Sequence, residues 1–505
     1  MSVTVCTVAP IGFEGTVVRV ECDMVKGLPT LQIVGLAAKS VDEAKERVRS
    51  AIRNTHLNFA DSKVTVNLSP ANIQKDGSHY DLPIALAILA ETGQLRSDKI
   101  NDIAVAGELG LDGTLRSIRG VVSIAETAKK AGVRTVIVPT QNAKQASLVS
   151  DIDVIAATNL RDVYLHLCGE KVIEPTRWSA GDFVAKKPSI DISDIKGQDH
   201  AKRALLIAAA GHHNVLLDGP PGAGKTMLAK ALVGIMPPPT HDEMVEITKL
   251  YSLSGETEDG IMTERPFRSP HHTASFISIV GGGTKPVPGE ISLAHDGVLF
   301  LDELPEYPRA SLEALRQPLE DRVIHVSRAS TKVTYPANFM LIATKNPCPC
   351  GYYGDMSREC TCTTTQLLHY QKRVSGPLLD RIDLVVHVAR ASEKDFLLRH
   401  AVSSDSLSDV WRSRVTNARQ VQYARYKKPL SNSQLTGKQL ARYARLSDSA
   451  EQLLQSAAQK MHLSARSYFK VIRVARTIAD LEDVAQIEPA HIAEALQYRT
   501  EAATG

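Results

Sequence analysis

Residues 215–226 have the types and spacing to bind the phosphates of a nucleotide. An apolar run at 215–217 predicts a buried strand, a G-x-x-x-x-G-K-T pattern comes next, and residues 227–233 predict a helix. The glycines of such a loop let successive backbone N–H groups point at one centre. Because the strand, loop, Lys-Thr pair and helix all occur in the required order, a glycine-rich turn without a chemical role is the weaker alternative. Lys225 would reach the β- and γ-phosphates, and the Thr226 hydroxyl would bind Mg²⁺. We expect nucleotide contacts from Gly219, Pro220, Pro221, Gly222, Ala223, Gly224, Lys225 and Thr226.

Two further apolar runs end in polar residues that suit nucleotide hydrolysis. Residues 298–301 predict a buried strand, and Asp302 and Glu303 come directly after it. Asp302 would hold Mg²⁺ together with Thr226, and Glu303 would orient or deprotonate the attacking water. Residues 341–344 predict a third strand, after which Asn346 would hydrogen-bond the γ-phosphate or the water. Capping of the turn before Pro347 is the alternative for Asn346.

Four of the seven cysteines lie in one loop. Four thiolates can complete a tetrahedral Zn²⁺ site with no open position, which is typical of a structural site. The C-x-C spacing is less usual than C-x-x-C, and two disulfides are the alternative, although a reducing cytosol disfavours them. The sequence therefore predicts a structural zinc held by Cys348, Cys350, Cys360 and Cys362.

The composition is that of an ordinary globular protein of about three domains. The chain has 505 residues, of which 43% are hydrophobic and 23% charged, and its net charge is +3. Global charge thus indicates no particular partner, and a nucleic-acid surface would have to be local. No run of 18 apolar residues and no signal peptide are present, so we expect a cytoplasmic protein without a membrane partner.

The pattern of predicted elements divides the chain into three domains and a linker. Residues 1–175 predict an α+β domain, in which Ser40 and Glu43 form a capping box for a helix that ends near residue 54. Residues 176–190 suit a linker. Residues 191–390 contain the nucleotide motifs and predict an α/β core, and residues 391–505 predict a helical lid.

Residues 74–77 and parts of 107–139 resemble the proteolytic domain of the Lon family, which has a ribosomal-S5-like fold. That family cleaves peptides with a Ser–Lys dyad, in which the lysine deprotonates the serine. Here the serine position falls near Asp81 and the lysine position near Val122, and neither side chain can do this chemistry. Ser78 lies close by, without a lysine at the matching place. We therefore expect a binding or assembly module without a dyad.

The core resembles the AAA+ class of ring ATPases. Gln198 comes after a glycine at the position where that class contacts the adenine. Residues 375–383 are similar to the segment that supplies an arginine to the neighbouring subunit's site, so Arg381 would act in trans. An ion pair with Asp380 or Asp383 is the alternative for Arg381.

The last helices resemble the AAA+ lid. Arg466 would be the sensor-2 arginine and would reach a γ-phosphate of its own or a neighbouring site. Arg473 and Arg476 lie nearby on the same predicted helix and are alternatives, as is an ordinary surface arginine.

Two segments of the core are additional to the nucleotide motifs. Residues 265–285 form an insertion between the two nucleotide motifs, and residues 322–335 alternate as a hairpin before the third strand. Both resemble the clade that contains the magnesium-chelatase motor and the MCM helicases, in which these loops face a central pore. Lys285, Arg328 and Lys332 could then touch the phosphates of a threaded strand, and solvated surface cations are the alternative. His271 and His272 favour a turn or interface over a metal pair.

Taken together, residues 346–352, residues 375–383 and the Lon-like domain resemble the magnesium-chelatase-like ComM family, also called YifB. Lys345 differs from the small or apolar residue expected there. The resemblance implies an ATP-driven, Mg²⁺-dependent hexameric ring that works as a helicase or translocase on single-stranded, forked or branched DNA. It also implies a role in branch migration during natural transformation. A chelatase-type motor that remodels a protein partner is the alternative, and an ATP-dependent protease is the next.

Overall fold

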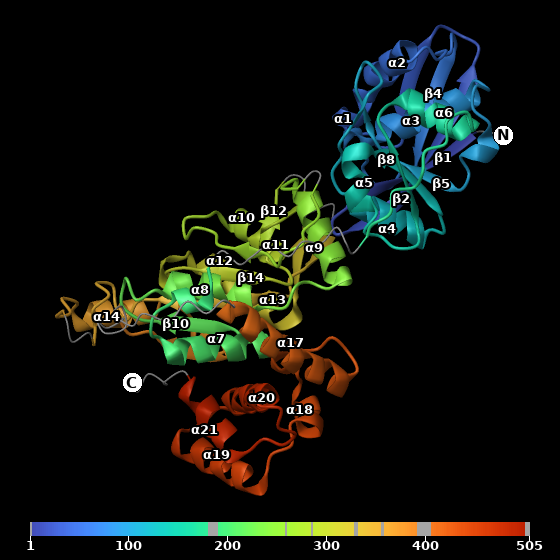
Figure 1. The fold of residues 1–505 in the computed structure, drawn as a ribbon. Coiled ribbons are helices and arrows are strands. Elements are labelled where there is room, and N and C mark those ends of the chain that lie inside the picture. Colours follow the sequence, from blue (N-terminus) through green and yellow to red (C-terminus); the bar gives the residue numbers. More distant parts are fainter. Residues whose placement is uncertain are drawn as a thin grey trace.

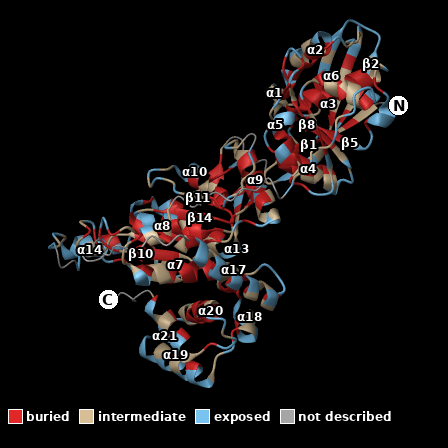
Figure 2. Cartoon of the chain, viewed as in Figure 1, coloured by how far each residue is buried: buried red, intermediate tan, exposed pale blue. Residues whose placement is uncertain are grey.

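The computed structural model describes residues 3–179, 190–257, 260–283, 286–327, 332–354, 358–390 and 406–499. The chain forms an elongated molecule (Figure 1), in which an N-terminal domain, a central α/β core and a C-terminal helical region come one after another. Buried residues concentrate in the two sheets and in the helices against them (Figure 2). The fold class expected from the sequence is confirmed.

A mixed seven-stranded sheet with the order β3-β4-β2-β1-β5-β8-β9 organises the N-terminal domain. Strands β1, β2 and β4 pair antiparallel, whereas β5, β8 and β9 continue the sheet in parallel. The strands are β1 (Val3–Ile11), β2 (Glu14–Val25), β3 (Thr30–Val34), β4 (Lys63–Ser69), β5 (Ile103–Val105), β8 (Thr135–Pro139) and β9 (Asp153–Ala157), with a short hairpin of β6 (Glu108–Leu109) and β7 (Leu115–Arg116).

Helices build two separate apolar clusters on this sheet, as alternate strand residues enter one cluster or the other. One cluster contains α2 (Ala44–Asn54), α3 (Asp81–Glu91) and α6 (Leu160–Cys168), and the other contains α4 (Val121–Lys130) and α5 (Thr140–Ala146). The predicted capping box is wrong. The chain forms α1 (Lys39–Asp42) before α2 instead, and the Ser40 hydroxyl donates to Asp76 Oδ1 (2.6 Å).

The positions that correspond to a protease dyad have structural roles. The Asp81 side chain is fully buried and accepts two hydrogen bonds from the Arg47 guanidinium (2.6 and 2.9 Å). Val122 is buried in the cluster around α4. The Ser78 hydroxyl donates to Glu108 rather than to a lysine. Protease chemistry therefore has no support from these side chains.

We predict that Arg47→Ala destabilises the N-terminal domain by about 3 kcal/mol, because it leaves the Asp81 carboxylate buried without its counter-ion. Denaturant unfolding followed by circular dichroism would measure the loss. The control is Arg96→Ala, which breaks an exposed pair with Asp98 and should cost less than about 1 kcal/mol. Equal stability of the two variants would contradict the prediction.

The core is a parallel five-stranded sheet with the order β11-β14-β17-β10-β18. Its strands are nearly continuous apolar runs, which is typical of a sheet that is covered on both faces. They are β11 (Phe267–Arg268), β14 (Val298–Leu301), β17 (Met340–Lys345), β10 (Val215–Asp218) and β18 (Leu384–His387).

Each face of the core sheet has its own apolar cluster. Helices α7 (Asp199–Gly211) and α8 (Lys225–Ile235) pack on one face. Helix α9 (His241–Ser254) and the elements after it pack on the other. The remaining core elements are α10 (Phe276–Val280), β12 (Gly281–Gly282), β13 (Val287–Pro288), α11 (Glu290–Leu293), α12 (Arg309–Ala314), α13 (Arg316–Asp321), β15 (Val323–Ser327), β16 (Lys332–Pro336), α14 (Thr364–Gln371) and α15 (Gly376–Leu379).

The C-terminal region is helical and packs against the α7 face of the core. Its helices are α17 (Leu407–Tyr426), α18 (Gly437–Tyr443), α19 (Asp448–Lys460), α20 (Ala465–Leu481) and α21 (Pro489–Gln497). Arg476 is fully buried in this region and pairs with Asp480 (3.0 Å), so it serves the internal structure of the lid. The predicted boundaries near 176–190 and 391 fall mainly on residues 180–189 and 391–405, which lie outside the described residues.

The N-terminal domain contacts the core through α4 and α9 (Figure 1). Lys249 on α9 pairs with Glu126 on α4 and lies 4.0 Å from the centre of the Phe13 ring. The backbone N–H of Gly120 donates to the Ser252 hydroxyl (3.0 Å). The N-terminal domain is therefore attached to the helix that precedes the 265–285 insertion.

Candidate functional site

The predicted phosphate loop connects β10 to α8 at the carboxyl edge of the core sheet. Gly222 and Gly224 have φ angles of +81° and +86°, a backbone region that favours glycine, although a Cβ at either would meet no atom within 4 Å. Gly219 has a different reason, since a Cβ there would lie 2.1 Å from the Val388 carbonyl oxygen. Lys225 begins α8, so the loop N–H groups and the helix N-terminus face the same space.

The Lys225 ammonium is held inside the loop. It donates to the Gly219 and Pro220 carbonyls (2.5 and 3.0 Å) and to the Asn346 side-chain oxygen (2.9 Å). Burial lowers the pKa of Lys225, and the nearby Asp302 carboxylate opposes that effect. The structure thus brings Asn346 to the phosphate loop.

The two predicted acids lie beside this loop. The Thr226 hydroxyl donates to Asp302 Oδ2 (3.3 Å), so the two expected Mg²⁺ ligands are neighbours. Glu303 has a φ of +54°, which is uncommon for a residue with a side chain and is a kind of backbone strain that often occurs at functional sites.

Thr344 is a site residue that the sequence reasoning missed. Its hydroxyl donates to Asp302 Oδ1 (2.6 Å) and accepts from the backbone N–H of Glu303 (2.9 Å). It therefore positions both acids. The sequence signal that could have identified Thr344 is its position near the carboxyl end of β17, where it pairs with Leu217 of β10, close to the start of the phosphate loop.

Two further predicted residues lie near the same edge. Gln198 precedes α7, and its side-chain amide donates to the Ala389 carbonyl (2.5 Å), one residue beyond the Val388 carbonyl that contacts Gly219. Its contact with adenine stays a prediction. Lys345, the residue that departs from the family pattern, pairs with Asp218 (3.2 Å) at the end of β10.

Arg381 lies at the opposite, amino edge of the sheet. It comes three residues before β18, which runs parallel to β10, and its carbonyl accepts from the side chain of Asn214, just before β10. The four residues of β10 separate the two edges by roughly 13 Å. The Arg381 guanidinium pairs with Glu320 (2.8 Å), rather than with the expected alternatives Asp380 or Asp383.

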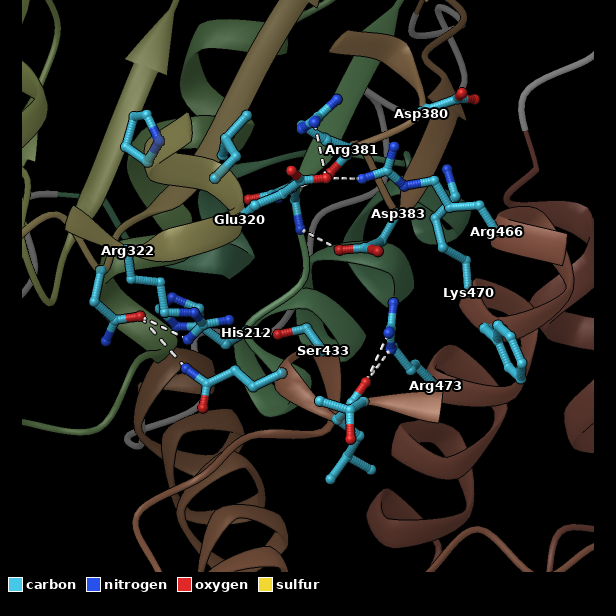
Figure 3. Close-up of a pocket in the computed structure, with 18 of the residues that line it drawn as sticks. His212, Glu320, Arg322, Asp380, Arg381, Asp383, Ser433, Arg466, Lys470 and Arg473 are labelled. Carbon is cyan, nitrogen blue, oxygen red and sulfur yellow. Dashed lines mark hydrogen bonds and ion pairs between the residues drawn. The ribbon is translucent and has the colours of Figure 1, made fainter. Parts of the chain in front are cut away.

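Arg466, in the first turn of α20, pairs with the same Glu320 carboxylate. Arg381 and Arg466 thus lie together beside Glu320 (Figure 3). Both are at the amino edge of the sheet, whereas their own phosphate loop is at the carboxyl edge. A role of either arginine at a nucleotide therefore requires the nucleotide of another subunit.

The four clustered cysteines gather as predicted. The Cys348 sulfur lies 3.3 Å from that of Cys350 and 3.7 Å from that of Cys360, and all four sulfurs lie within 4.8 Å of one another. Zn–S bonds of about 2.3 Å in a tetrahedron would place the sulfurs roughly 3.8 Å apart. All four cysteines are free thiols. The donor set and spacing fit zinc and argue against two disulfides.

The cysteine loop also touches the phosphate loop. Gly351 lies within the cysteine loop, has a φ of +86°, and approaches Pro221 so closely that a Cβ at Gly351 would lie 2.6 Å from the proline Cδ. The zinc-binding candidate therefore packs directly against the phosphate loop.

We predict that the purified protein carries about one zinc per chain, since four thiolates leave no open coordination position. Elemental analysis of protein purified without chelator would measure it, and Cys360→Ser should lose the metal. Cys168→Ser, an exposed cysteine outside the cluster, should retain it. Absence of zinc in the parent protein would contradict the prediction.

A second group of potential ligands does not suit a metal. Glu246, His295 and Asp296 lie together, but His295 Nδ1 accepts a hydrogen bond from the backbone N–H of Asn338 (3.0 Å). His295 Nε2 must then carry the proton that it shares with Glu246 (2.7 Å). These residues form an internal hydrogen-bond network.

The hairpin and the insertion lie side by side in the core. Ile277 of α10 and Val326 of β15 both approach Gly282. Lys332 is exposed at the start of β16, whereas Lys285 and Arg328 lie outside the described residues. His271 bonds the Thr273 hydroxyl (2.7 Å) and His272 packs edge-on against Tyr307, which agrees with the predicted turn.

A phosphate loop between β10 and α8, two acids at the end of β14, one strand away from β10 across β17, and a helical lid define an AAA+ ATPase. The pattern "Magnesium chelatase, subunit ChlI" matches residues 191–396, "Subunit ChlI of Mg-chelatase" matches 20–142, and "Magnesium chelatase, subunit ChlI C-terminal" matches 405–499. The chain belongs to the magnesium-chelatase ChlI family, and within it to the relatives of YifB and ComM.

Two similar proteins span nearly the whole chain. "Uncharacterized protein YifB" of Salmonella typhimurium is 44% identical over 98% of this chain and 96% of its own. "Competence protein ComM" of Haemophilus influenzae is 43% identical over 97% of this chain and 96% of its own. A "Lon protease" of Chloroflexus aurantiacus is 33% identical over 26% of this chain and 16% of its own, which supports the Lon-like assignment. Within the described residues, no helix is long and apolar enough to span a membrane.

Proposed function

We propose that this protein is an ATP-driven helicase or translocase that acts as a ring of six identical subunits and promotes branch migration when incoming DNA is integrated during natural transformation. Similarity to a protein named for competence supports the biological setting. The AAA+ family implies ATP hydrolysis, which would supply the energy.

The observation that carries the proposal is the separation of two halves of one catalytic site. The phosphate loop, Asp302 and Glu303 lie at the carboxyl edge of the core sheet, and Arg381 and Arg466 lie at the amino edge. A nucleotide that contacts all of them must lie between two subunits, and a closed ring gives every subunit both neighbours.

The chemistry divides among the side chains of the two subunits. Glu303 would orient or deprotonate the lytic water, and Asn346, already bonded to Lys225, would hold the γ-phosphate or that water. Thr226 and Asp302 would hold Mg²⁺, which supplies positive charge to the phosphates. The neighbour's Arg381 would stabilise the charge that develops during transfer.

DNA contact would come from the hairpin and the insertion, which form one unit around Gly282. The proposed contacts are Lys332 together with Lys285 and Arg328. Phosphate contacts of this kind need positive charge and no particular base, which suits a motor that moves along any sequence.

Steady-state ATPase rates with and without DNA test the proposal. Single-stranded or forked DNA should raise the rate, and the enzyme should unwind a three-stranded junction with ATP. A rate that is indifferent to DNA at low salt would overturn the proposal and favour the second candidate, a chelatase-type motor that remodels a protein partner, which the family membership favours.

We predict that Lys332→Ala weakens DNA binding equally for all sequences and lowers the slope of log affinity against log salt by about one. Fluorescence anisotropy at several salt concentrations would measure both. Lys438→Ala, an exposed lysine of α18 in the lid, is the matched control and should leave the slope unchanged. Equal slopes for all three proteins would exclude Lys332 from the DNA surface.

A further inference from the structure

A cavity of about 310 Å³ opens at the amino edge of the core sheet, between the core and α20 (Figure 3). Its volume far exceeds the roughly 30 Å³ that a water molecule occupies in the liquid. Five cationic and three acidic side chains line it. The lining cations are Arg322, Arg381, Arg466, Lys470 and Arg473, and the acids are Glu320, Asp380 and Asp383.

The outer part of the cavity is internally compensated. Glu320 pairs with both Arg381 and Arg466. Asp383 accepts from the backbone N–H of Asn214 (3.0 Å) and lies 3.5 Å from His213 Nδ1. Glu320 and Asp383 are therefore already engaged with these partners, and Asp380 acts electrostatically on Lys470.

The inner part is lined by Arg322 and Arg473, which form no direct ion pair with any residue that the structure describes. Burial lowers the pKa of each guanidinium, and the Asp383 carboxylate opposes that effect through space. Arg322 donates to the Asn338 side-chain oxygen (2.9 Å), and Arg473 donates to the Leu435 carbonyl (2.9 and 2.6 Å). Within the part of the chain that the structure describes, neither guanidinium has a carboxylate within 4.0 Å. Other half-buried guanidinium groups do have one, as in the pairs of Arg268 with Glu290 and Arg425 with Asp480, whereas the buried Arg419 donates only to the Ala209 carbonyl among the described residues.

Two buried polar atoms in the same lining lack partners. His212 is only 9% exposed, and neither its Nε2 nor the Ser433 hydroxyl has a hydrogen-bond partner among the described atoms. Buried polar atoms rarely stay unsatisfied. Burial and the nearby Arg419 and Arg322 hold the pKa of His212 well below its usual value, so the ring is neutral and offers one N–H donor.

We propose that the inner part of this cavity binds a phosphate group, held by Arg322, Arg473, His212 and Ser433. Two planar guanidinium forks suit a phosphate oxyanion, and the histidine N–H and the serine hydroxyl supply neutral donors. The bound group would also give the two arginines the direct anionic contact that no carboxylate among the described residues provides. Its source is either free inorganic phosphate or the terminal phosphate of a neighbouring subunit's nucleotide.

Titration of inorganic phosphate into full-length Lys225→Ala protein, by calorimetry, tests the proposal without ATP turnover. We expect saturable binding that weakens at least tenfold when Arg473→Gln is added. The control Arg373→Gln, whose arginine pairs with Glu306 outside the cavity, should keep the affinity. Any phosphate binding that remains at the loop 219–226 is the same in all variants. The part of the phosphate binding that disappears with Arg473→Gln is therefore assigned to the cavity.

A second variant separates binding from folding. Ser433→Glu places a carboxylate in the cavity and leaves the bonds of Arg473 to Leu435 in place, so phosphate affinity should fall to the same extent. The midpoint of thermal unfolding in phosphate-free buffer serves as the folding check. Absence of saturable binding, or parental affinity in both Arg473→Gln and Ser433→Glu, would overturn the proposal.

The two sources are distinguished with the parent protein assembled on a non-hydrolysable ATP analogue. If the neighbour's terminal phosphate occupies the cavity, added phosphate should raise the analogue concentration needed for assembly. If free phosphate is the ligand, it should bind the assembled, analogue-loaded ring at the affinity measured with the Lys225→Ala protein. Either result supports the site, and neither depends on movement along DNA, so failure of the DNA motor proposal would leave it standing.

Discussion

Glu303→Gln should lower the ATP turnover number at least 100-fold while the protein still binds ATP. The amide keeps the size of the side chain and the backbone N–H bond to Thr344, but it cannot accept the proton of the attacking water. Turnover measured at saturating ATP, beside equilibrium binding of a fluorescent ATP analogue, would separate chemistry from binding. The same variant should hold the ring together, because bound ATP persists at the subunit boundary.

Glu306→Gln is the matched control for this prediction. Glu306 lies three residues further along the chain, is exposed and pairs with Arg373 (2.6 Å). The Glu306→Gln protein should therefore hydrolyse ATP at the parental rate. A Glu303→Gln protein that hydrolyses ATP as fast as the parent would remove Glu303 from the proposed role.

Arg381→Ala should cost about a thousandfold or more in turnover, which is the usual effect of losing an arginine that acts in trans. The sharper expectation concerns mixtures. A subunit with Arg381→Ala keeps an intact phosphate loop, and a subunit with Lys225→Ala keeps its arginine. Where the two alternate in a ring, the first can hydrolyse ATP with the arginine of the second, so mixing two inactive proteins should restore activity.

A mixture of Lys225→Ala and Glu303→Gln is the control for that experiment. Both changes damage the carboxyl-edge half of a subunit's own site, so no neighbour can compensate and the mixture should stay inactive. Recovery in the control, or none in the Arg381→Ala mixture, would contradict the assignment of Arg381 to a neighbouring nucleotide.

The carboxyl edge of the core could be predicted from sequence because its signals are local. An apolar run that ends in Asp302 and Glu303, or in G-K-T, indicates both the strand and the functional residues at its end. Parallel pairing then brings these strand ends together, which produces the contacts Thr226–Asp302 and Lys225–Asn346. The cysteine cluster was predictable for a similar reason, since all four thiols lie within 15 consecutive residues, 348–362.

The amino edge could not be predicted in the same way, because its contacts join distant segments. Glu320 ends up between Arg381 and Arg466, which lie 61 and 146 residues further along the chain, and no local pattern indicates such a triple. Ser40 shows the same limit, since a bond to Asp76 replaces the helix cap that the sequence favoured. Long-range partners of this kind outweigh local propensity.

The contact between Gly351 and Pro221 would couple zinc binding by the cysteine loop to ATP binding by the phosphate loop. The loop that carries the four thiols packs directly against the predicted phosphate loop, so a change in one loop would be felt by the other. If that loop holds zinc as predicted, cells starved of zinc would make subunits that fold with both sheets intact but bind ATP more weakly. Under the proposed function, the integration of incoming DNA would then fail although the protein stays folded.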